Sequence, residues 1–308
     1  MKTLHEPVLL NETVNSLITD IHGTYVDCTV GGGGHLSYLT EKLSSDACII
    51  GLDKDQEILN QTKEKVNHPH LQFISADFRD IQIVLQKAGI EKVDGIMADL
   101  GVSSFQLDRV DRGFSFHDDA RLDMRMDRDQ TFTAEDLVNE YDEKEISQIL
   151  FQYGEEKYAR SIARAICKHR VQERISTTAE LVEVIRKGVP AKYAREKHPA
   201  RKSFQAIRIA VNRELEALEE LMPQSLELLK PGGRLCIISF HSLEDRMVKR
   251  FFQEESKTCV CPPGYPVCVC GHQPRMKIIT RKPIIAVEEE LERNPRSRSA
   301  KLRVGERI

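Results

Sequence analysis

The sequence predicts an α/β fold, in which a mainly parallel β-sheet with helices between its strands is interrupted by an all-helical insertion. Three observations predict this fold. Short apolar runs alternate with segments whose leucines recur at helical spacing, and the first of these runs stops at four glycines. About a hundred residues in the middle of the chain contain no strand candidate.

The first part of the chain predicts strand–helix units. Strands are expected at 25–29, 47–53, 71–75 and 93–99. Glycines 31–34 form a turn after the first strand, and Leu36, Leu39 and Leu43 then recur at helical spacing. Because strands alternate with helices, right-handed crossovers should make the sheet parallel.

The pattern changes after the fourth strand. Residues 104–130 are polar and irregular, and 133–229 have helical periodicity throughout. A turn at 229–234 then leads into a strand at 235–240 and a helix at 242–253, and two further strands are expected at 276–281 and 302–304. We therefore expect one sheet domain made of 1–104 and 216–308, and an inserted helical domain at 105–215.

Charge is segregated along the 308 residues, although the formal net charge is only −3. Residues 157–213 hold 15 Lys and Arg against 4 Asp and Glu, and residues 293–308 hold 6 against 1. Such basic segments on an acidic remainder favour a polyanionic partner such as RNA, with solvated helix faces as the alternative. We see no signal peptide and no membrane-spanning run, so a cytoplasmic location is expected.

The glycine turn predicts a cofactor site. Glycine lets the backbone approach a ligand closely, and an acidic residue about 20 positions later can accept the hydroxyls of a ribose. Gly33 and Asp53 have this separation, and both should lie at the carboxyl edge of the sheet. The pattern indicates an adenosine-containing cofactor.

The acidic residues at the strand ends distinguish between two such cofactors. Asp27 precedes the glycines, where it would repel the pyrophosphate of NAD but suit a cation. Asp77 and Phe78 could contact an adenine, and Asp99 would face the sulfonium end. An acidic crevice of this kind favours S-adenosylmethionine, although a single Asp at these positions is as often a loop cap or a solvated acid.

Several stretches resemble the bacterial 16S rRNA cytosine-N4 methyltransferases that act near the decoding centre. The matching residues run from 5 to the end of the chain and lie at 5–10, 27–35, 99–108, 112–116, 122–127, 239–246 and 294–299. The segments at 122–127 and 239–246 are the most specific. Arg121 departs from the family, in which a proline is expected at this position.

The resemblance implies a class I, Rossmann-like, S-adenosylmethionine-dependent methyltransferase with a seven-stranded sheet and a helical insertion. It also implies that the substrate is a cytidine of 16S rRNA, acted on within the small ribosomal subunit. The cofactor contacts that it implies are Gly33, Gly34, His35, Asp53, Phe78, Asp99 and Gln106.

The lone pair of a cytosine N4 is delocalised into the ring, so its reaction needs an acceptor for an N–H. The Asp/Asn/Ser-Pro-Pro-aromatic motif of many amino-methyltransferases is replaced here by Asp-Leu-Gly-Val at 99–102. Our hypothesis is that Asp99, or an aspartate of the segment 122–127 such as Asp123, accepts from N4. Phe114 or Phe116 could stack on a flipped base, but core packing is the more common role for either one.

A long helix is expected after Pro199, with Phe204, Ile207 and Val211 on its core face. Several basic residues should then be free for phosphate contacts, or simply be solvated. Those of the helix are Arg201, Lys202, Arg208 and Arg213, and those of the C-terminal segment are Arg296, Arg298, Lys301 and Arg303.

Four cysteines cluster as Cys259, Cys261, Cys268 and Cys270, with His272 close behind. Four thiolates in a short loop suit a structural zinc ion, although the spacing within each pair is C-x-C rather than the commoner C-x₂-C. Free thiols and disulfides formed in air are the alternatives. The cluster is far in sequence from the expected base site, so we expect no catalytic role for it.

Three other functions remain open at this point. They are methylation of DNA or of another RNA base, a non-catalytic RNA-binding assembly factor, and a nicotinamide oxidoreductase. The sequence does not predict an oligomeric state.

Overall fold

The structure is a computed structural model that describes residues 6–196, 198–262, 264 and 267–308. The chain divides into two compact units. Unit 1 comprises Met1–Gly101 and Leu215–Ile308, and unit 2 comprises Val102–Glu214. The insertion expected at 105–215 differs from unit 2 by three residues at its start and by one at its end. Of the matching stretch at 5–10, His5 lies outside the described residues.

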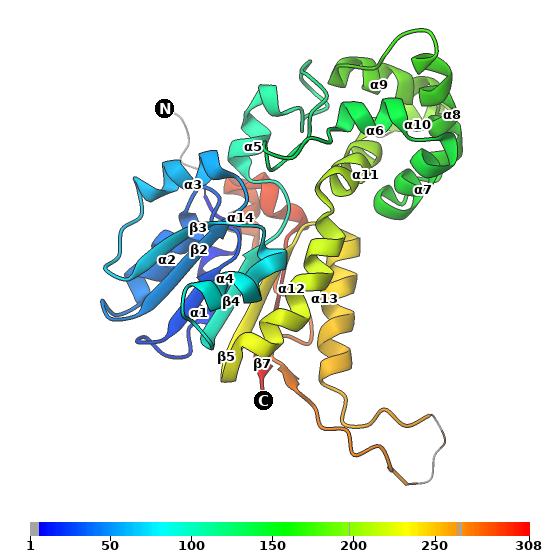
Figure 1. Cartoon of the computed structure of the whole chain (residues 1–308). Coiled ribbons are helices and arrows are strands. Elements are labelled where there is room, and N and C mark those ends of the chain that lie inside the picture. Colours follow the sequence, from blue (N-terminus) through cyan, green and yellow to red (C-terminus); the bar gives the residue numbers. More distant parts are fainter. Residues whose placement is uncertain (1–5, 197, 263, 265–266) are drawn as a thin grey trace. The chain divides into compact units, whose positions relative to one another are not determined.

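Unit 1 is built on a seven-stranded sheet in the order β3-β2-β1-β4-β5-β7-β6 (Figure 1). Strands β1 to β5 are parallel, and β7 is antiparallel to both β5 and β6. This order confirms the predicted class I, Rossmann-like fold. The strands are β1 (Thr24–Asp27), β2 (Cys48–Asp53), β3 (Leu71–Ser75), β4 (Val93–Asp99), β5 (Leu229–Ser239), β6 (Met276–Ile278) and β7 (Lys301–Arg307).

Both faces of the sheet are buried, as expected for parallel strands covered by helices. Neighbouring residues on a strand point to opposite faces, so Tyr25 and Ile49 join one core while Val26 and Ile50 join the other. Helices α1 and α2 pack on the first face, and α4, α12 and α13 pack on the second. The helices of unit 1 are α1 (Leu10–Leu17), α2 (Gly34–Lys42), α3 (Gln56–Lys63), α4 (Ile81–Lys87), α12 (Glu214–Leu228), α13 (Ser242–Glu255) and α14 (Glu288–Arg293), with 3-10 turns η1 (Phe78–Asp80) and η3 (Pro295–Ser299).

The expected turn at 229–234 lies instead within strand β5. Val93 pairs with Leu229 but Gly95 pairs with Arg234, so the residues between bulge out of the ladder. Gly232 has φ 83°, a conformation that glycine adopts without strain. The Pro-Gly-Gly signal therefore marks a bulge inside a strand rather than the end of a helix–strand connection.

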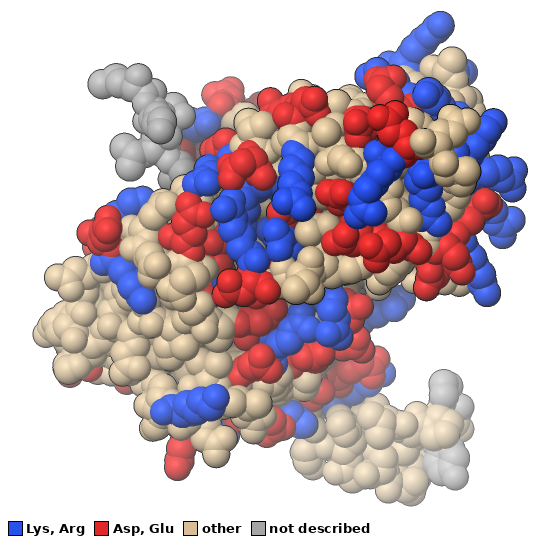
Figure 2. Space-filling view, turned by 45° about the horizontal axis from the view of Figure 1, so that its top comes forward, with Lys and Arg blue, Asp and Glu red and all other residues tan. Residues whose placement is uncertain are grey.

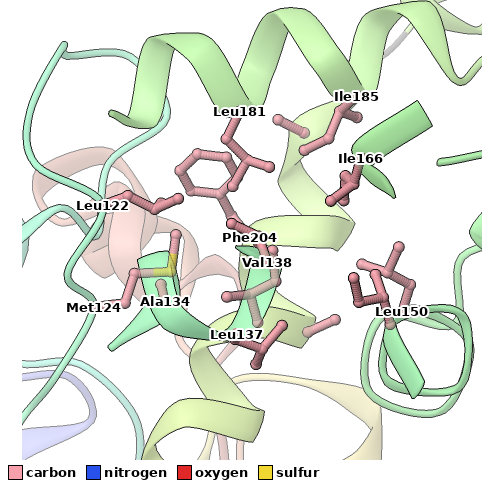
Figure 3. Close-up of a cluster of buried hydrophobic side chains, with 14 of the residues drawn as sticks. Leu122, Met124, Ala134, Leu137, Val138, Leu150, Ile166, Leu181, Ile185 and Phe204 are labelled. Carbon is pink, nitrogen blue, oxygen red and sulfur yellow. The ribbon is translucent and has the colours of Figure 1, made fainter. Parts of the chain in front are cut away.

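Unit 2 is helical around its own hydrophobic core, which is shown in Figure 3. Phe204, Ile207 and Val211 of α11 are buried in this core, as the spacing predicts. Among the described residues no helix is both long enough and apolar enough to cross a bilayer. The helices of unit 2 are α5 (Ser104–Asp108), α6 (Ala134–Glu140), α7 (Glu143–Gly154), α8 (Ala159–Arg170), α9 (Thr178–Lys187), α10 (Ala191–Glu196) and α11 (Ala200–Asn212), with the 3-10 turn η2 (Val110–Arg112).

Two buried polar side chains hold the irregular segment 122–127 of unit 2. Arg112 is 1% exposed and its Nη2 donates to the carbonyls of Arg125 and Met126, at 2.9 and 2.8 Å. Asn212 accepts from the backbone N–H of Met126 at 2.7 Å and donates to the carbonyl of Met124 at 2.8 Å. Because buried backbone groups need partners, these bonds fix a segment that has no helix or strand of its own.

Candidate functional site

The glycine turn between β1 and α2 is bonded to β2 and α3. The backbone N–H of Gly31 donates to Asp53 Oδ2 at 2.8 Å, and Thr62 Oγ1 donates to the carbonyl of Gly31 at 2.7 Å. Gly33 has φ 80°, and a Cβ there would lie 2.5 Å from Thr62. The turn therefore needs glycine for both its conformation and its packing.

The N-terminal segment packs directly on this turn. A Cβ on Gly34 would lie 2.0 Å from Cγ of Pro7, so the proline ring packs on the glycine without room for a side chain. His35 is 6% exposed, and its Nε2 is 3.0 Å from the carbonyl of Val8. Because a carbonyl only accepts, Nε2 carries the proton of this bond, and Nδ1 lies 3.7 Å from Asp99 Oδ2.

Asp53, at the end of β2, has backbone donors on both oxygens. Gly31 donates to Oδ2, and the N–H of Asp55 donates to Oδ1 at 2.9 Å. Burial raises the pKa of Asp53 to about 6, and the two backbone hydrogen bonds limit the rise. The carboxyl is thus held at the carboxyl edge of the sheet with lone pairs left to accept ligand hydroxyls.

Asp27 and Asp99, at the ends of β1 and β4, are the two most perturbed carboxyls of this edge. Asp27 has no exposed surface, and burial raises its pKa to about 7. Burial, followed by the charges of Asp27 and Glu244, raises the pKa of Asp99 well above its ordinary value. Strong pKa shifts of this kind are typical of functional sites.

One oxygen of each carboxyl lacks a partner. Oδ2 of Asp27 and Oδ1 of Asp99 are buried and form no hydrogen bond with any residue that the structure describes. Buried carboxyls without partners are costly, and a nearby cation would favour their charged form. The arrangement therefore fits a cationic ligand, and a sulfonium or ammonium group supplies that charge.

Asp77 was expected to add a fourth unpaired carboxylate to the acidic edge, but its carboxylate is paired with cations. Its Oδ2 lies 3.2 Å from Arg79 Nε and 3.9 Å from Lys54 Nζ, and its Oδ1 accepts from the N–H of Arg79. These cations offset its charge, so the acidity of the edge comes from Asp27, Asp53, Asp99 and Glu244 instead. Phe78 begins η1 and is half-buried beside Asp77.

Sequence reasoning missed two residues that position this edge. Thr29 Oγ1 accepts the backbone N–H of Asp99 at 2.6 Å, which links the glycine turn to β4. Glu244 is 2% exposed and accepts from the N–H of Phe240 at 2.8 Å, while His241 caps the start of α13. The acidic residue three positions after a cap residue is a helix-start signal that could have identified Glu244.

The sequence that forms the glycine turn, the acidic edge and the sheet matches a known family over nearly its whole length. The model of the MraW methylase family matches residues 2–308. The chain belongs to the MraW methylase family. It is therefore a methyltransferase, and S-adenosylmethionine is its methyl donor.

Curated relatives match along the whole chain. A protein of Clostridium botulinum (strain Loch Maree / Type A3) named "Ribosomal RNA small subunit methyltransferase H" is 51% identical over 309 residues, covering 100% of both chains. Proteins of the same name from Carboxydothermus hydrogenoformans and Brevibacillus brevis are 50% and 48% identical, covering 100% and 99% of this chain and 99% and 98% of theirs.

Two residues singled out for the MraW chemistry lie in unit 2. Gln106 is buried, and its Oε1 accepts from the N–H of Ser103 in a capping box at the start of α5. Asp123 forms a two-oxygen ion pair with Arg125, with N···O distances of 2.7 and 2.8 Å. Burial would raise the pKa of Asp123, but the hydrogen bonds from Arg125 outweigh it and lower the pKa. The roles of Gln106 and Asp123 stay predictions.

The two phenylalanines suggested for base stacking already have partners in unit 2. Phe114 is 7% exposed and belongs to the hydrophobic core. Phe116 is half-buried, and its ring stacks on His198 with centroids 4.4 Å apart. Phe114 therefore has the packing role that is common for such residues, and one face of the Phe116 ring is already occupied by His198.

Two of the basic residues expected to be free in unit 2 are bonded within it. Arg208 donates from Nε and Nη2 to the two oxygens of Glu214, both at 2.8 Å, because Glu214 is buried and needs a cation. Lys202 Nζ donates to the carbonyl of Glu155 at 2.7 Å. Arg201 and Arg213 are exposed, and Figure 2 shows blue and red side chains interspersed on the face in view.

The C-terminal basic residues also divide into two kinds. Arg303 and Lys301 lie on β7 and form ion pairs with Asp245 at 2.6 and 2.9 Å. Arg303 is buried, so the expectation that its side chain is free to contact phosphate is wrong. Arg296 and Arg298 lie in the turn η3 and are exposed.

The structure brings the four clustered cysteines together. Their sulfur atoms all lie within 4.8 Å of one another, in the loop between α13 and β6. The nearby His272 is not part of this group.

Proposed function

We propose that this protein transfers the methyl group of S-adenosylmethionine to the exocyclic N4 of a cytidine in 16S rRNA near the decoding centre. The observation that carries the proposal is the sequence identity to proteins named "Ribosomal RNA small subunit methyltransferase H", which is 51% and 50% over the full length of the chain. The acidic edge of unit 1 is further support for a methyl donor that carries a positive charge. The proposed substrate is the small ribosomal subunit in the cytoplasm.

The residues of unit 1 that we propose to hold the donor follow from the geometry of the edge. Gly33 and Gly34 allow the turn to pack tightly against Thr62 and Pro7, and His35 bonds the turn to the carbonyl of Val8, so the turn is held in place to contact the donor. Asp53 would accept the ribose hydroxyls, and Phe78 would pack on the adenine. Asp27 and Asp99 would face the cationic end, where their unpartnered oxygens gain a counter-charge.

Asp99 is our first candidate for the acceptor of the N4 proton. When bound, the donor supplies a methyl group on a positively charged sulfur, and attack by N4 requires that an N–H of the base be oriented and removed. Oδ1 of Asp99 is buried and has no hydrogen-bond partner among the described residues, so it can accept this N–H. Asp123 is the second candidate, although its two oxygens already bind Arg125.

Phosphate contacts are proposed for the exposed arginines. Arg201 and Arg213 of unit 2, and Arg296 and Arg298 of η3, are exposed to solvent and would position RNA without reading its sequence. Lys202 and Arg208 can contribute only by leaving Glu155 and Glu214.

The experiment that tests the proposal is transfer of labelled methyl to small ribosomal subunits that lack the modification, followed by nucleoside analysis. Label in N4-methylcytidine is the expected result. Label in another nucleoside would replace the cytosine assignment, and donor binding without labelled RNA would favour an assembly factor. Naked 16S rRNA, assayed in parallel, shows whether the assembled particle is needed.

The acceptor is tested by replacing Asp99 and Asp123 separately with asparagine. We expect Asp99→Asn to lower the rate of transfer at saturating donor by about 10²- to 10⁴-fold, because a neutral amide is a weaker proton acceptor. The same change should also weaken donor binding, because it removes a negative charge that faces the cationic end of the donor. Asp123→Asn should change the rate less. Full turnover in both variants, with donor bound, would rule out both candidates.

A further inference from the structure

None of the described residues in the loop between α13 and β6, at 258–262, 264 and 267–272, is buried. We call residues 258–272 the cysteine loop; it contains no Asp, Glu, Lys or Arg. Its valines face solvent, with Val260, Val267 and Val269 exposed by 54%, 70% and 73%. In Figure 2 it projects as a tan body without blue or red surface. Small elements that cannot bury apolar surface are usually held by a disulfide or a metal.

The cysteine sulfurs have the spacing of a metal-thiolate site. Sγ of Cys270 lies 3.4 Å from Sγ of Cys268 and 3.8 Å from Sγ of Cys259, and all four sulfurs lie within 4.8 Å of one another. Tetrahedral zinc with bonds of about 2.3 Å would separate its sulfur ligands by about 3.8 Å. All four cysteines are free thiols, so no disulfide accounts for their approach.

The backbone of the loop is arranged around these sulfurs. The N–H of Val260 donates to Sγ of Cys270, and the N–H of Cys261 donates to Sγ of Cys259, both at 3.4 Å. Donors aimed at sulfur favour the thiolate, which is the form that binds metal. Two backbone amides of the first C-x-C pair thus donate to sulfur atoms of the cluster, one of them to a cysteine of the second pair.

We propose that Cys259, Cys261, Cys268 and Cys270 bind one Zn²⁺ ion, which folds the cysteine loop. Zinc is favoured because four thiolates in tetrahedral array are its preferred structural ligand set. Four protein ligands leave no open coordination position, so the ion is structural rather than catalytic.

The place of the loop in the fold agrees with a structural role. Helix α13 begins just after the carboxyl end of β5 and runs back along the sheet, so the loop that follows α13 lies at the opposite end of the strands (Figure 1). Asp27, Asp53 and Asp99 all end their strands at the carboxyl edge. Loss of the metal should therefore leave donor binding intact.

The test measures metal in the full-length, untagged chain purified under reducing conditions without chelator. Elemental analysis should find about one zinc per chain, and cobalt substituted for zinc should give the visible absorption of tetrahedral thiolate coordination. The double variant Cys259→Ser/Cys268→Ser should lose both signals. Cys167→Ser, which changes a free cysteine of unit 2, should keep them.

Two further measurements keep the result interpretable. Donor binding by calorimetry should be unchanged in the double variant, which shows that unit 1 still folds and separates this proposal from the proposed function. Amide exchange across 258–272 should accelerate when a chelator removes the ion. A folded, donor-binding wild type without zinc or cobalt signal would overturn the proposal, as would a double variant that keeps its metal.

Discussion

Asp27 shows how one residue can link ligand binding to stability. Its carboxyl has no exposed surface, and one oxygen has no hydrogen-bond partner within the described part of the chain. The unfolded chain would ionise this group near its ordinary pKa of 3.8, whereas burial raises the pKa of the folded state to about 7. Between these values the folded state binds more protons than the unfolded state.

We therefore expect the donor-free chain to lose stability as the pH rises through this window. The raised pKa of Asp27, about 7, means that ionisation in the folded state opposes folding by at most about 4 kcal/mol, at 1.36 kcal/mol per unit. Denaturant unfolding of the wild type and of Asp27→Asn, between about pH 5 and pH 8, measures the effect.

The variant is the control for this prediction, because asparagine cannot ionise. Its stability should fall less steeply than that of the wild type over the same range. Saturating S-adenosylmethionine should flatten the wild-type curve, since a cation beside Asp27 favours the charged form. Identical pH profiles in the two proteins would contradict the assignment.

Individual site residues differed in how well the sequence predicted them. Asp53 was predictable because its distance from the glycine turn is set by the length of one helix crossover. The ion pair of Asp77 was not, because Arg79 is two residues away and Lys54 is on another strand end, so only the fold shows that both reach it. The pairing of Arg208 with Glu214 depends in the same way on where helix α11 ends.

Among the elements, the N-terminal segment at 6–9 and the segment 31–35, which contains the glycine turn, are packed and hydrogen-bonded together. Pro7 fills the space over Gly34, and Val8 accepts from His35. The segment is also tied to α14, because the N–H of Leu9 donates to Glu290 at 2.9 Å. These contacts give a packing reason for a matching stretch to which the sequence alone assigned no role.

A matched pair of substitutions tests this contact. Gly34→Ala places a Cβ 2.0 Å from Pro7, so the segment must move, and we expect a lower melting temperature and weaker donor binding. Gly32→Ala meets nothing within 4 Å and should leave the melting temperature unchanged. The test is the melting temperature of both variants, measured with and without donor. An equal drop in the two variants would show that contact with Pro7 does not cause the destabilisation.

Helical periodicity predicted the type of the elements between β4 and β5, and it shows that one face of each is apolar. The sequence predicts helix throughout 133–229, and the last of these helices, α12, falls almost entirely within the segment 216–308 that was expected to belong to the sheet domain. Leu218 and Leu221 of α12 pack on the sheet of unit 1. The start of β5 was missed because a bulge and a turn share the same Pro and Gly signals.

For the whole molecule, charge segregation leads to a prediction about salt. The basic run at 157–213 lies entirely within unit 2, and an RNA contact made there should release counterions. We expect Arg201→Gln to weaken binding to small-subunit rRNA and to reduce the slope of log affinity against log salt by about one. Binding measured at several salt concentrations gives the slope.

The control removes an equal charge from unit 1. Lys87 is exposed on α4, outside the basic run, and Lys87→Gln should leave the slope unchanged. Equal slopes for the wild type and Arg201→Gln would show that Arg201 makes no phosphate contact. Equal reductions in both variants would point to net charge rather than to a site.

The position of unit 2 between β4 and β5 has a consequence for synthesis on the ribosome. These two strands are neighbours in the sheet, yet all of Val102–Glu214 leaves the exit tunnel between them. The nascent chain thus presents the whole helical unit before β5 is available to extend the sheet beside β4. If the helical unit folds first, the flexible loop that connects β4 to β5 becomes shorter. The entropic cost of closing that loop when β5 pairs with β4 is then lower. The order of translation therefore favours a sequence of events in which the helical unit folds first and the edge that binds the methyl donor is completed second.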